Sequence, residues 1–259
     1  SNGGDGGITE VDRPLGDQWP FHAVAAVIRA HSLLRSLPQV DADRIGLTGI
    51  SWGGWLTCIV AGVDHRFKFA ASVYGCGFIH EESAFQARIA QAPQWVAWWE
   101  PSHYLTRCRV PMLWVSSPTD FAYPLDSVQK SYRAAPGPHV MSIRVGLPHT
   151  HGDPSEKNAE VAAFADAILR GGKPLARIKS VAPGLVTFSS VTRIVSATLN
   201  FTADTGPWDK RQWQTIPAKL DETAGTVTAA IPPATRQYYF NLTDERGLVV
   251  SSEHVTVHE

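Results

Sequence analysis

Apolar positions near the start of the chain recur at the spacing of a helix. Residues 20–37 predict a helix, because Phe21, Val24 and Ile28 lie near one face and Pro20 suits a first turn. Short apolar runs and amphipathic stretches then alternate as far as residue 170. Strands are predicted over 44–48, 69–74, 110–116 and 140–145, and helices over 55–62, 126–135 and 156–170. This alternation is typical of an α/β protein with a mostly parallel sheet.

The pattern changes near residue 178 to short runs separated by turn residues. The runs 195–201 and 237–242 alternate with period two, and residues 244–247 carry a hairpin-turn signal. About seven such runs indicate an immunoglobulin/fibronectin-like β-sandwich. We therefore predict an α/β domain over residues 1–175 and a β-sandwich domain over residues 176–259.

The stretch 47–54 carries the first chemical signal. Gly49, Ser51 and Gly53 form a G-x-S-x-G pattern between a predicted strand and a predicted helix, which is typical of a nucleophile elbow. We expect Ser51 to occupy a strained turn, and a side chain at position 49 or 53 to collide with the neighbouring strand or helix. A chance Gly-Ser-Gly loop is the alternative, and the flanking strand and helix argue against it.

A serine hydroxyl needs a base to attack a carbonyl, and the base needs a carboxylate to orient it. Asp120 follows the strand predicted over 110–116, and His149 lies in the loop after the next strand, so both are expected at the sheet edge of Ser51. Asp126 competes with Asp120, but its place in the following helix suits an N-cap. His151 competes with His149, which we favour because it is nearer the strand end.

An oxyanion formed at Ser51 would be stabilised by the backbone N–H of Trp52 and by a second donor from an earlier loop. Only one strand is predicted before Ser51, and the Gly-rich residues 3–7 are a poor match for a donor loop. We therefore expect a separate chain or segment outside this numbering to complete the sheet and to supply that donor.

Aromatic residues are frequent over 79–107, a segment that predicts short helices near the site. Trp95, Trp98 and Trp99 have two interpretations, as part of the packed core or as a substrate-pocket wall above Ser51. Trp208 and Trp213 raise a similar choice in the predicted sandwich, where packing is favoured over glycan binding.

Composition narrows the function classes. The net charge of −1 over 259 residues gives no reason to expect nucleic acid or an anionic membrane as a partner, and no run of 18 apolar residues exists. Three cysteines without metal-ligand spacing predict neither a disulfide scaffold nor a metal site. The N-terminus lacks signal-peptide character, which is compatible with export of a longer precursor and leaves a secreted or periplasmic location open.

Three segments together resemble the serine α/β-hydrolases, in the branch of acetyl xylan esterases, cephalosporin-C deacetylases and prolyl-oligopeptidase-like enzymes. They are residues 40–54, 117–120 and 148–152, and the likeness spans roughly residues 17–172. The C-terminal part is similar, more weakly, to the β-sandwich of PhoPQ-activated-protein-like bacterial hydrolases, over residues 204–208 and 211–213. The resemblance implies an α/β-hydrolase fold and ester hydrolysis through an acyl-enzyme without a cofactor. The early strands of that fold are expected to be missing from this chain, which departs from the family.

Three functions remain open at this point. The first is a carboxylesterase for small acyl groups, acetyl esters above all, with a small-molecule ester as substrate. The second is a serine peptidase of the prolyl-oligopeptidase kind, which needs an anchor for a substrate N-terminus or a gating domain. The third is a non-catalytic binding protein on a hydrolase scaffold, and the complete set of Ser51, Asp120 and His149 argues against it.

Overall fold

The structure is a computed structural model that describes residues 4–153 and 156–257. Two compact units can be distinguished in it. One comprises the residues up to Met112 together with Asp126–His139, and the other comprises Leu113–Leu125 together with the residues from Val140 onward. The predicted domain boundary near residue 175 stays a prediction.

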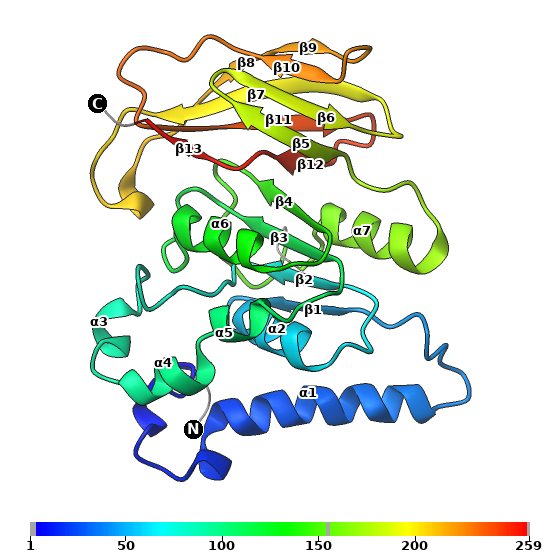
Figure 1. Cartoon of the computed structure of the whole chain (residues 1–259), viewed down its shortest axis with the longest axis vertical. Helices are drawn as coiled ribbons and strands as arrows, with labels where there is room; N and C mark the ends of the chain where they lie inside the picture. Colours follow the sequence, from blue (N-terminus) through cyan, green and yellow to red (C-terminus); the bar gives the residue numbers. More distant parts are fainter. Residues whose placement is uncertain (1–3, 154–155, 258–259) are drawn as a thin grey trace. The chain divides into compact units, whose positions relative to one another are not determined.

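The first unit is mostly helical (Figure 1). Its helices are η1 (Ile8–Glu10), η2 (Leu15–Asp17), α1 (Trp19–Ser36), α2 (Trp52–Val63), α3 (Gln86–Ile89), α4 (Pro93–Trp99), α5 (Ser102–Leu105) and α6 (Leu125–Ala134). The predicted long first helix and the short helices of the aromatic segment are therefore confirmed.

Strands β1 (Leu47–Ile50) and β2 (Ala70–Val73) pair in parallel, with Leu47 opposite Ala70 and Ile50 opposite Val73. The predicted strand over 44–48 begins too early. Residues 41–44 form a turn instead, because the Arg44 N–H donates to the Asp41 carbonyl (3.0 Å) and the Asp41 carboxylate accepts from the Asp43 N–H (2.9 Å). The strand consequently begins at Leu47. It ends at Ile50, the residue before Ser51.

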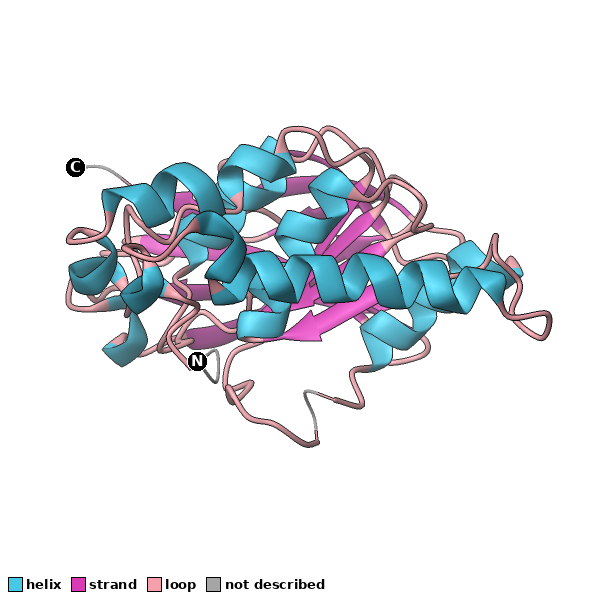
Figure 2. Ribbon diagram, turned by 90° about the horizontal axis from the view of Figure 1, so that it is seen from below, coloured by secondary structure: helices cyan, strands magenta, loops and turns pink. Residues whose placement is uncertain are grey.

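Helix α1, the long helix in front in Figure 2, is the longest helix among the described residues. It packs against α2. Their shared core contains buried Ile45, Val60 and Phe67, against which Val24 and Val27 of α1 lie partly buried. Helix α2 also packs on β1 and β2. The helix that follows Ser51 is therefore fixed by apolar contacts on both sides, which holds its first turn in place.

Strands β1, β2, β3 (Met112–Ser116) and β4 (His139–Ile143) form a four-stranded sheet in that order, so β1 stands at one end of it. Residues 4–46 contribute no strand to this sheet. The expectation that polypeptide outside this numbering pairs with β1 stays a prediction. The α/β class with a parallel sheet is confirmed.

The C-terminal part of the chain is β-rich and consists of antiparallel pairs. Its strands are β5 (Arg177–Ala182), β6 (Leu185–Ser189), β7 (Ile194–Thr202), β8 (Gln214–Pro217), β9 (Lys219–Asp221), β10 (Thr226–Thr228), β11 (Gln237–Asp244), β12 (Val249–Ser251) and β13 (Val255–Thr256). One sheet has the order β5-β6-β10-β9 and the other β12-β11-β7-β8, with β13 beside β11. The predicted β-sandwich is confirmed, and its described residues, up to 257, form nine strands rather than about seven.

Helix α7 (Ala159–Arg170) lies in the chain between the last strand of the parallel sheet and the first strand of the antiparallel sheets. It begins later than the predicted residue 156. The Asn158 side chain caps it by accepting the Val161 N–H at 3.0 Å, and Gly171 ends it with a φ of 73°. Within the described residues, no helix combines the length and the apolar character that crossing a membrane would need.

Candidate active site

Ser51 occupies the turn between β1 and α2 in a backbone conformation that non-glycine residues rarely adopt, with φ at 59° and ψ at −121°. The Ser51 N–H donates to the Val73 carbonyl at the end of β2 (2.9 Å), and its carbonyl accepts the Trp55 N–H of α2 (3.0 Å). The strand and the helix thus hold this strained conformation from both sides. Strain of this kind costs about 1–3 kcal/mol and persists where the surrounding structure over-determines it.

Two glycines allow the close approach of the strand to the helix. A Cβ on Gly49 would lie 2.2 Å from the Gly53 carbonyl oxygen, and a Cβ on Gly54 would lie 2.6 Å from Ser72 Oγ. The predicted collision at Gly53 is wrong, because a Cβ there meets nothing within 4 Å. Gly54, which lies outside the sequence pattern, makes the close contact with the neighbouring strand instead.

Trp52 is the first residue of α2, and the N–H groups of a first helical turn have no acceptor within their own helix. Its N–H thus lies in the turn where the helix dipole favours negative charge. The Trp52 indole packs against Phe85 (ring centroids 4.6 Å apart) and Trp55 (5.5 Å). A Cβ on Gly6 would come within 2.3 Å of this indole, so the N-terminal loop lies directly against it.

The three tryptophans of the aromatic segment differ in exposure. Trp95 is fully buried, stacks on Trp55 at 5.6 Å and donates its indole N–H to the Gly6 carbonyl at 2.9 Å. Trp99 is also buried and donates to the side-chain oxygen of Gln18 at 2.7 Å. Their burial fits the packing interpretation, whereas Trp98 is 38% exposed and keeps the pocket-wall interpretation open.

Asp120 and His149, both in the second unit, lie together. The His149 Nδ1 atom is 2.7 Å from Asp120 Oδ2, and the Asp120 side chain is shielded from solvent. Because an ionised carboxylate only accepts hydrogen bonds, Nδ1 carries the proton, and Nε2 is the basic nitrogen of the neutral ring. The second carboxylate oxygen, Oδ1, accepts the N–H groups of Ala122 (2.9 Å) and Tyr123 (2.8 Å). This arrangement is the orienting pair that a general-base histidine requires.

The two competing residues lie elsewhere. His151 is exposed in the loop after β4, and Asp126 lies in the first turn of α6. Sequence reasoning did not foresee the aromatic residues around the His149 ring, which follow Asp120 directly in the chain. Phe121, 55% exposed, has its ring centroid 4.8 Å from that ring, and Tyr123 stacks on it at 6.2 Å.

Glu100 is a fully buried carboxylate in the aromatic segment of the first unit. Its Oε1 accepts the N–H groups of Phe78 (2.5 Å) and Ser102 (3.1 Å), and its Oε2 lies 3.3 Å from His80 Nδ1. The Glu100 carboxylate raises the pKa of His80 above its ordinary value. His80 lies in the loop after β2, where Phe78 has a φ of 60°, and Glu100 follows α4.

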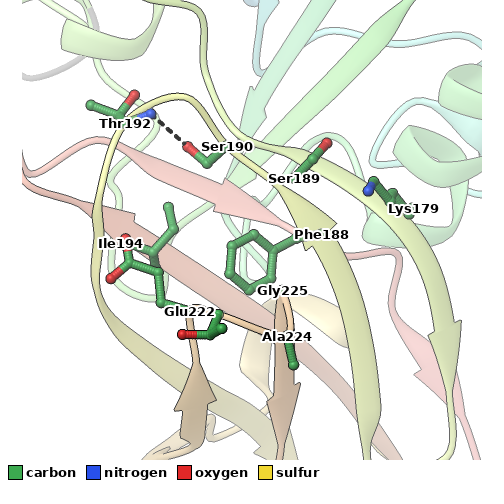
Figure 3. A pocket seen from close by; sticks show the side chains of 10 residues that line it. Lys179, Phe188, Ser189, Ser190, Thr192, Ile194, Glu222, Ala224 and Gly225 are labelled. Carbon is green, nitrogen blue, oxygen red and sulfur yellow. Dashed lines mark hydrogen bonds between the residues drawn. The ribbon is translucent and has the colours of Figure 1, made fainter.

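The β-rich region contains a pocket of about 250 Å³ (Figure 3). Phe188 and Ile194 provide apolar surface in it, and the charged side chains of Lys179 and Glu222 line it as well. Ser51, Asp120 and His149 are not among its lining residues. Over the described residues, no group of three or more His, Cys, Asp or Glu side chains is arranged to hold a metal ion.

Comparison with known proteins identifies the fold. Residues 13–135, slightly less than half of the chain, match the model of the prolyl oligopeptidase family. No curated protein matches the sequence.

Solved structures with this fold include esterases and peptidases. An acetyl xylan esterase from a Paenibacillus species is 22% identical, with a TM-score of 0.50 over 63% of this chain and 56% of its own. An acetyl xylan esterase from a Thermoanaerobacterium species is 17% identical, with a TM-score of 0.50 over 59% and 55% of the two chains. A puromycin-hydrolyzing peptidase of Mycobacterium tuberculosis is 21% identical, with a TM-score of 0.52 over 61% and 28%.

The chain therefore spans about half the length of the two esterases that it matches. Sequence identities at this level show the fold, which is that of the serine α/β-hydrolases. The expected resemblance to this group is confirmed.

Proposed function

We propose that this chain, which has the fold of the serine α/β-hydrolases, cleaves carboxylic esters of small acyl groups through an acyl-enzyme. In this proposal Ser51 is the nucleophile, His149 is the general base and Asp120 orients His149. The Trp52 N–H is one donor of the oxyanion hole. No cofactor takes part in the chemistry proposed.

The observation that carries the proposal is the backbone conformation of Ser51. A serine with φ at 59° and ψ at −121° between a strand and a helix is costly, and strained residues of this kind are concentrated at active sites and ligand-binding sites. A nucleophile elbow presents its hydroxyl at the sheet edge, and the N-terminus of α2 favours the negative charge that develops when a carbonyl is attacked.

The hydrogen bond between Asp120 and His149 supports the assignment of the base. With the Nδ1 proton directed at Asp120, the lone pair of Nε2 accepts the Ser51 proton during attack and later returns it to the leaving alcohol. The aromatic rings of Phe121 and Tyr123 restrict the orientation of the imidazole. A base held in one tautomer and one orientation is what acyl transfer requires.

The choice between ester and peptide substrates rests on similarity. The acetyl xylan esterases that share the fold motivate acetyl esters as the first candidate. The match to the prolyl oligopeptidase family motivates a peptidase as the second. A direct comparison of nitrophenyl esters of rising acyl length with aminoacyl-nitroanilides separates the two candidates.

The catalytic assignment is tested with single substitutions. Ser51→Ala should lower turnover of nitrophenyl acetate by up to roughly a million-fold, to the background rate, if the three residues act as a unit. His149→Ala should also abolish turnover, whereas His151→Ala, a matched change two positions away, should leave most of it. Far-ultraviolet circular dichroism of each variant reports whether the fold is intact.

Near-native esterase activity in Ser51→Ala would refute the nucleophile. Loss of turnover in His151→Ala, with His149→Ala still active, would reverse the assignment of the base. Faster cleavage of nitroanilides than of any ester would replace the esterase by the peptidase.

A further inference from the structure

The β-rich C-terminal region contacts the loop that carries Asp120. Trp208 lies in η3 (Trp208–Lys210), between β7 and β8, and its indole N–H donates to the main-chain carbonyl of Asp120 at 2.8 Å. The two residues are 88 positions apart in the chain and belong to the same compact unit. A residue of the β-sandwich region therefore bonds directly to the backbone of Asp120, the residue proposed to orient His149.

This hydrogen bond completes the set that fixes Asp120. The carboxylate is held through Oδ1 by two main-chain N–H groups and through Oδ2 by His149. The carbonyl oxygen bonded to Trp208 belongs to the peptide that joins Asp120 to Phe121. A planar peptide held at its oxygen cannot rotate freely, so the bond limits movement of the Asp120 side chain and of Phe121 together.

The segment that presents Trp208 is itself tied down. Arg211 donates through Nε to the Gly206 carbonyl (2.9 Å) and through Nη1 to the side-chain oxygen of Gln237 in β11 (2.7 Å). The Gln212 N–H donates to the Asp204 carboxylate at 2.6 Å. Because these bonds already order the segment around Trp208, little conformational entropy is lost when Trp208 bonds to the loop that carries Asp120.

We infer that Trp208 is a positioning residue for the Asp120–His149 pair, and this inference rests on the proposed function. The β-sandwich region is then part of the catalytic apparatus and not an independent binding module. Glycan binding through the indole N–H of Trp208 is disfavoured, because that group already donates to Asp120. The hydrogen bond acts on His149 through Asp120, so its loss should affect turnover more than substrate binding.

Trp208→Phe tests the inference, because it keeps an aromatic ring and removes the N–H donor. Trp213→Phe is the matched control, since the buried Trp213 Nε1 has no hydrogen-bond partner in the described structure. We expect Trp208→Phe to lower kcat for nitrophenyl acetate roughly 3- to 10-fold, the size of one net hydrogen bond, with KM nearly unchanged. Trp213→Phe should leave both constants at the wild-type values.

Proton NMR gives a second readout that packing alone would not change. The Nδ1 proton shared by His149 and Asp120 should resonate far downfield, and His149→Ala assigns it by removing it. In Trp208→Phe this resonance should shift or broaden, whereas Trp213→Phe should leave it in place.

Wild-type kcat together with an unshifted resonance in Trp208→Phe would overturn the inference. An equal loss of kcat in both tryptophan variants would overturn it as well, because it would indicate general packing. If the wild-type protein hydrolyses neither esters nor nitroanilides, the proposed function fails. The resonance then still decides whether Trp208 positions the pair.

Discussion

The glycines of the Ser51 turn offer a sharp test, because the sequence pattern predicts a collision at both Gly49 and Gly53 and the structure shows one only at Gly49. In Gly49→Ala the new Cβ would lie 2.2 Å from the Gly53 carbonyl oxygen and 2.4 Å from its carbon, both of which are backbone atoms. The strand or the helix must then shift by about 1 Å. Overpacking of this kind costs about 1–3 kcal/mol, which corresponds to roughly 2–12 °C in Tm.

Activity should fall further than stability. A displacement of about 1 Å at a nucleophile can cost on the order of 100-fold in rate, so Gly49→Ala should lose about that factor in kcat/KM for nitrophenyl acetate. The control is Gly53→Ala, where the added methyl meets nothing within 4 Å and lies inside α2. This change should keep the activity and raise the stability by up to about 1 kcal/mol, because alanine favours a helix.

The assays are calorimetric unfolding, ester hydrolysis and labelling of Ser51 by a serine-reactive phosphonate. The reasoning fails if Gly49→Ala retains wild-type rates, or if Gly53→Ala loses as much activity as Gly49→Ala. The second outcome would mean that the sequence pattern describes the turn better than the packing does.

Three further changes test other parts of the molecule. His80→Asn should lower Tm more at pH 6 than at pH 9, because a raised His80 pKa means that the stabilisation by Glu100 is fully present below about pH 6.5 and is lost as the pH rises through the folded-state pKa. Equal losses at both pH values would contradict this. Asn158→Ala removes the N-cap of α7 and should cost about 1 kcal/mol in chemical unfolding, whereas no measurable change would show that the cap is unimportant. Asp120→Asn should lower kcat by roughly four orders of magnitude, because its amide would donate to His149 Nδ1 and impose the wrong tautomer, and a loss below tenfold would argue against this role.

Local pattern is sufficient to predict most elements of this fold. Helix α1 and the short helices of the aromatic segment follow from apolar periodicity and from aromatic clustering, and both depend on residues close in sequence. Errors occur at the ends of elements, where one side chain decides. The Asp41 carboxylate holds a turn that delays β1, and Asn158 caps α7 two residues after its predicted start.

Contacts between distant segments could not be predicted in this way. No periodicity relates Trp208 to Asp120, because the hydrogen bond joins a side chain to a main-chain oxygen that every residue possesses. The same holds for Gly54 of α2, which has no room for a side chain because Ser72 of β2 lies against it. The residue types at the strand ends indicate which side chains could carry out the reaction. The packing of segments distant in sequence decides which other residues hold those side chains in position.

The partners of Asp120 explain why this carboxylate suits a catalytic role better than a structural ion pair. Among the described residues, its carboxylate oxygens are bonded by two neutral main-chain N–H groups and by the His149 ring. None of these carries the permanent charge of a guanidinium or an ammonium group, so the negative charge is oriented without being neutralised. When Ser51 gives up its proton in the proposed reaction, a positive charge appears on His149. The Asp120 carboxylate, which is within hydrogen-bond distance and still carries its negative charge, stabilises it. A lysine or arginine in place of these neutral donors would hold Asp120 equally well and would weaken that stabilisation.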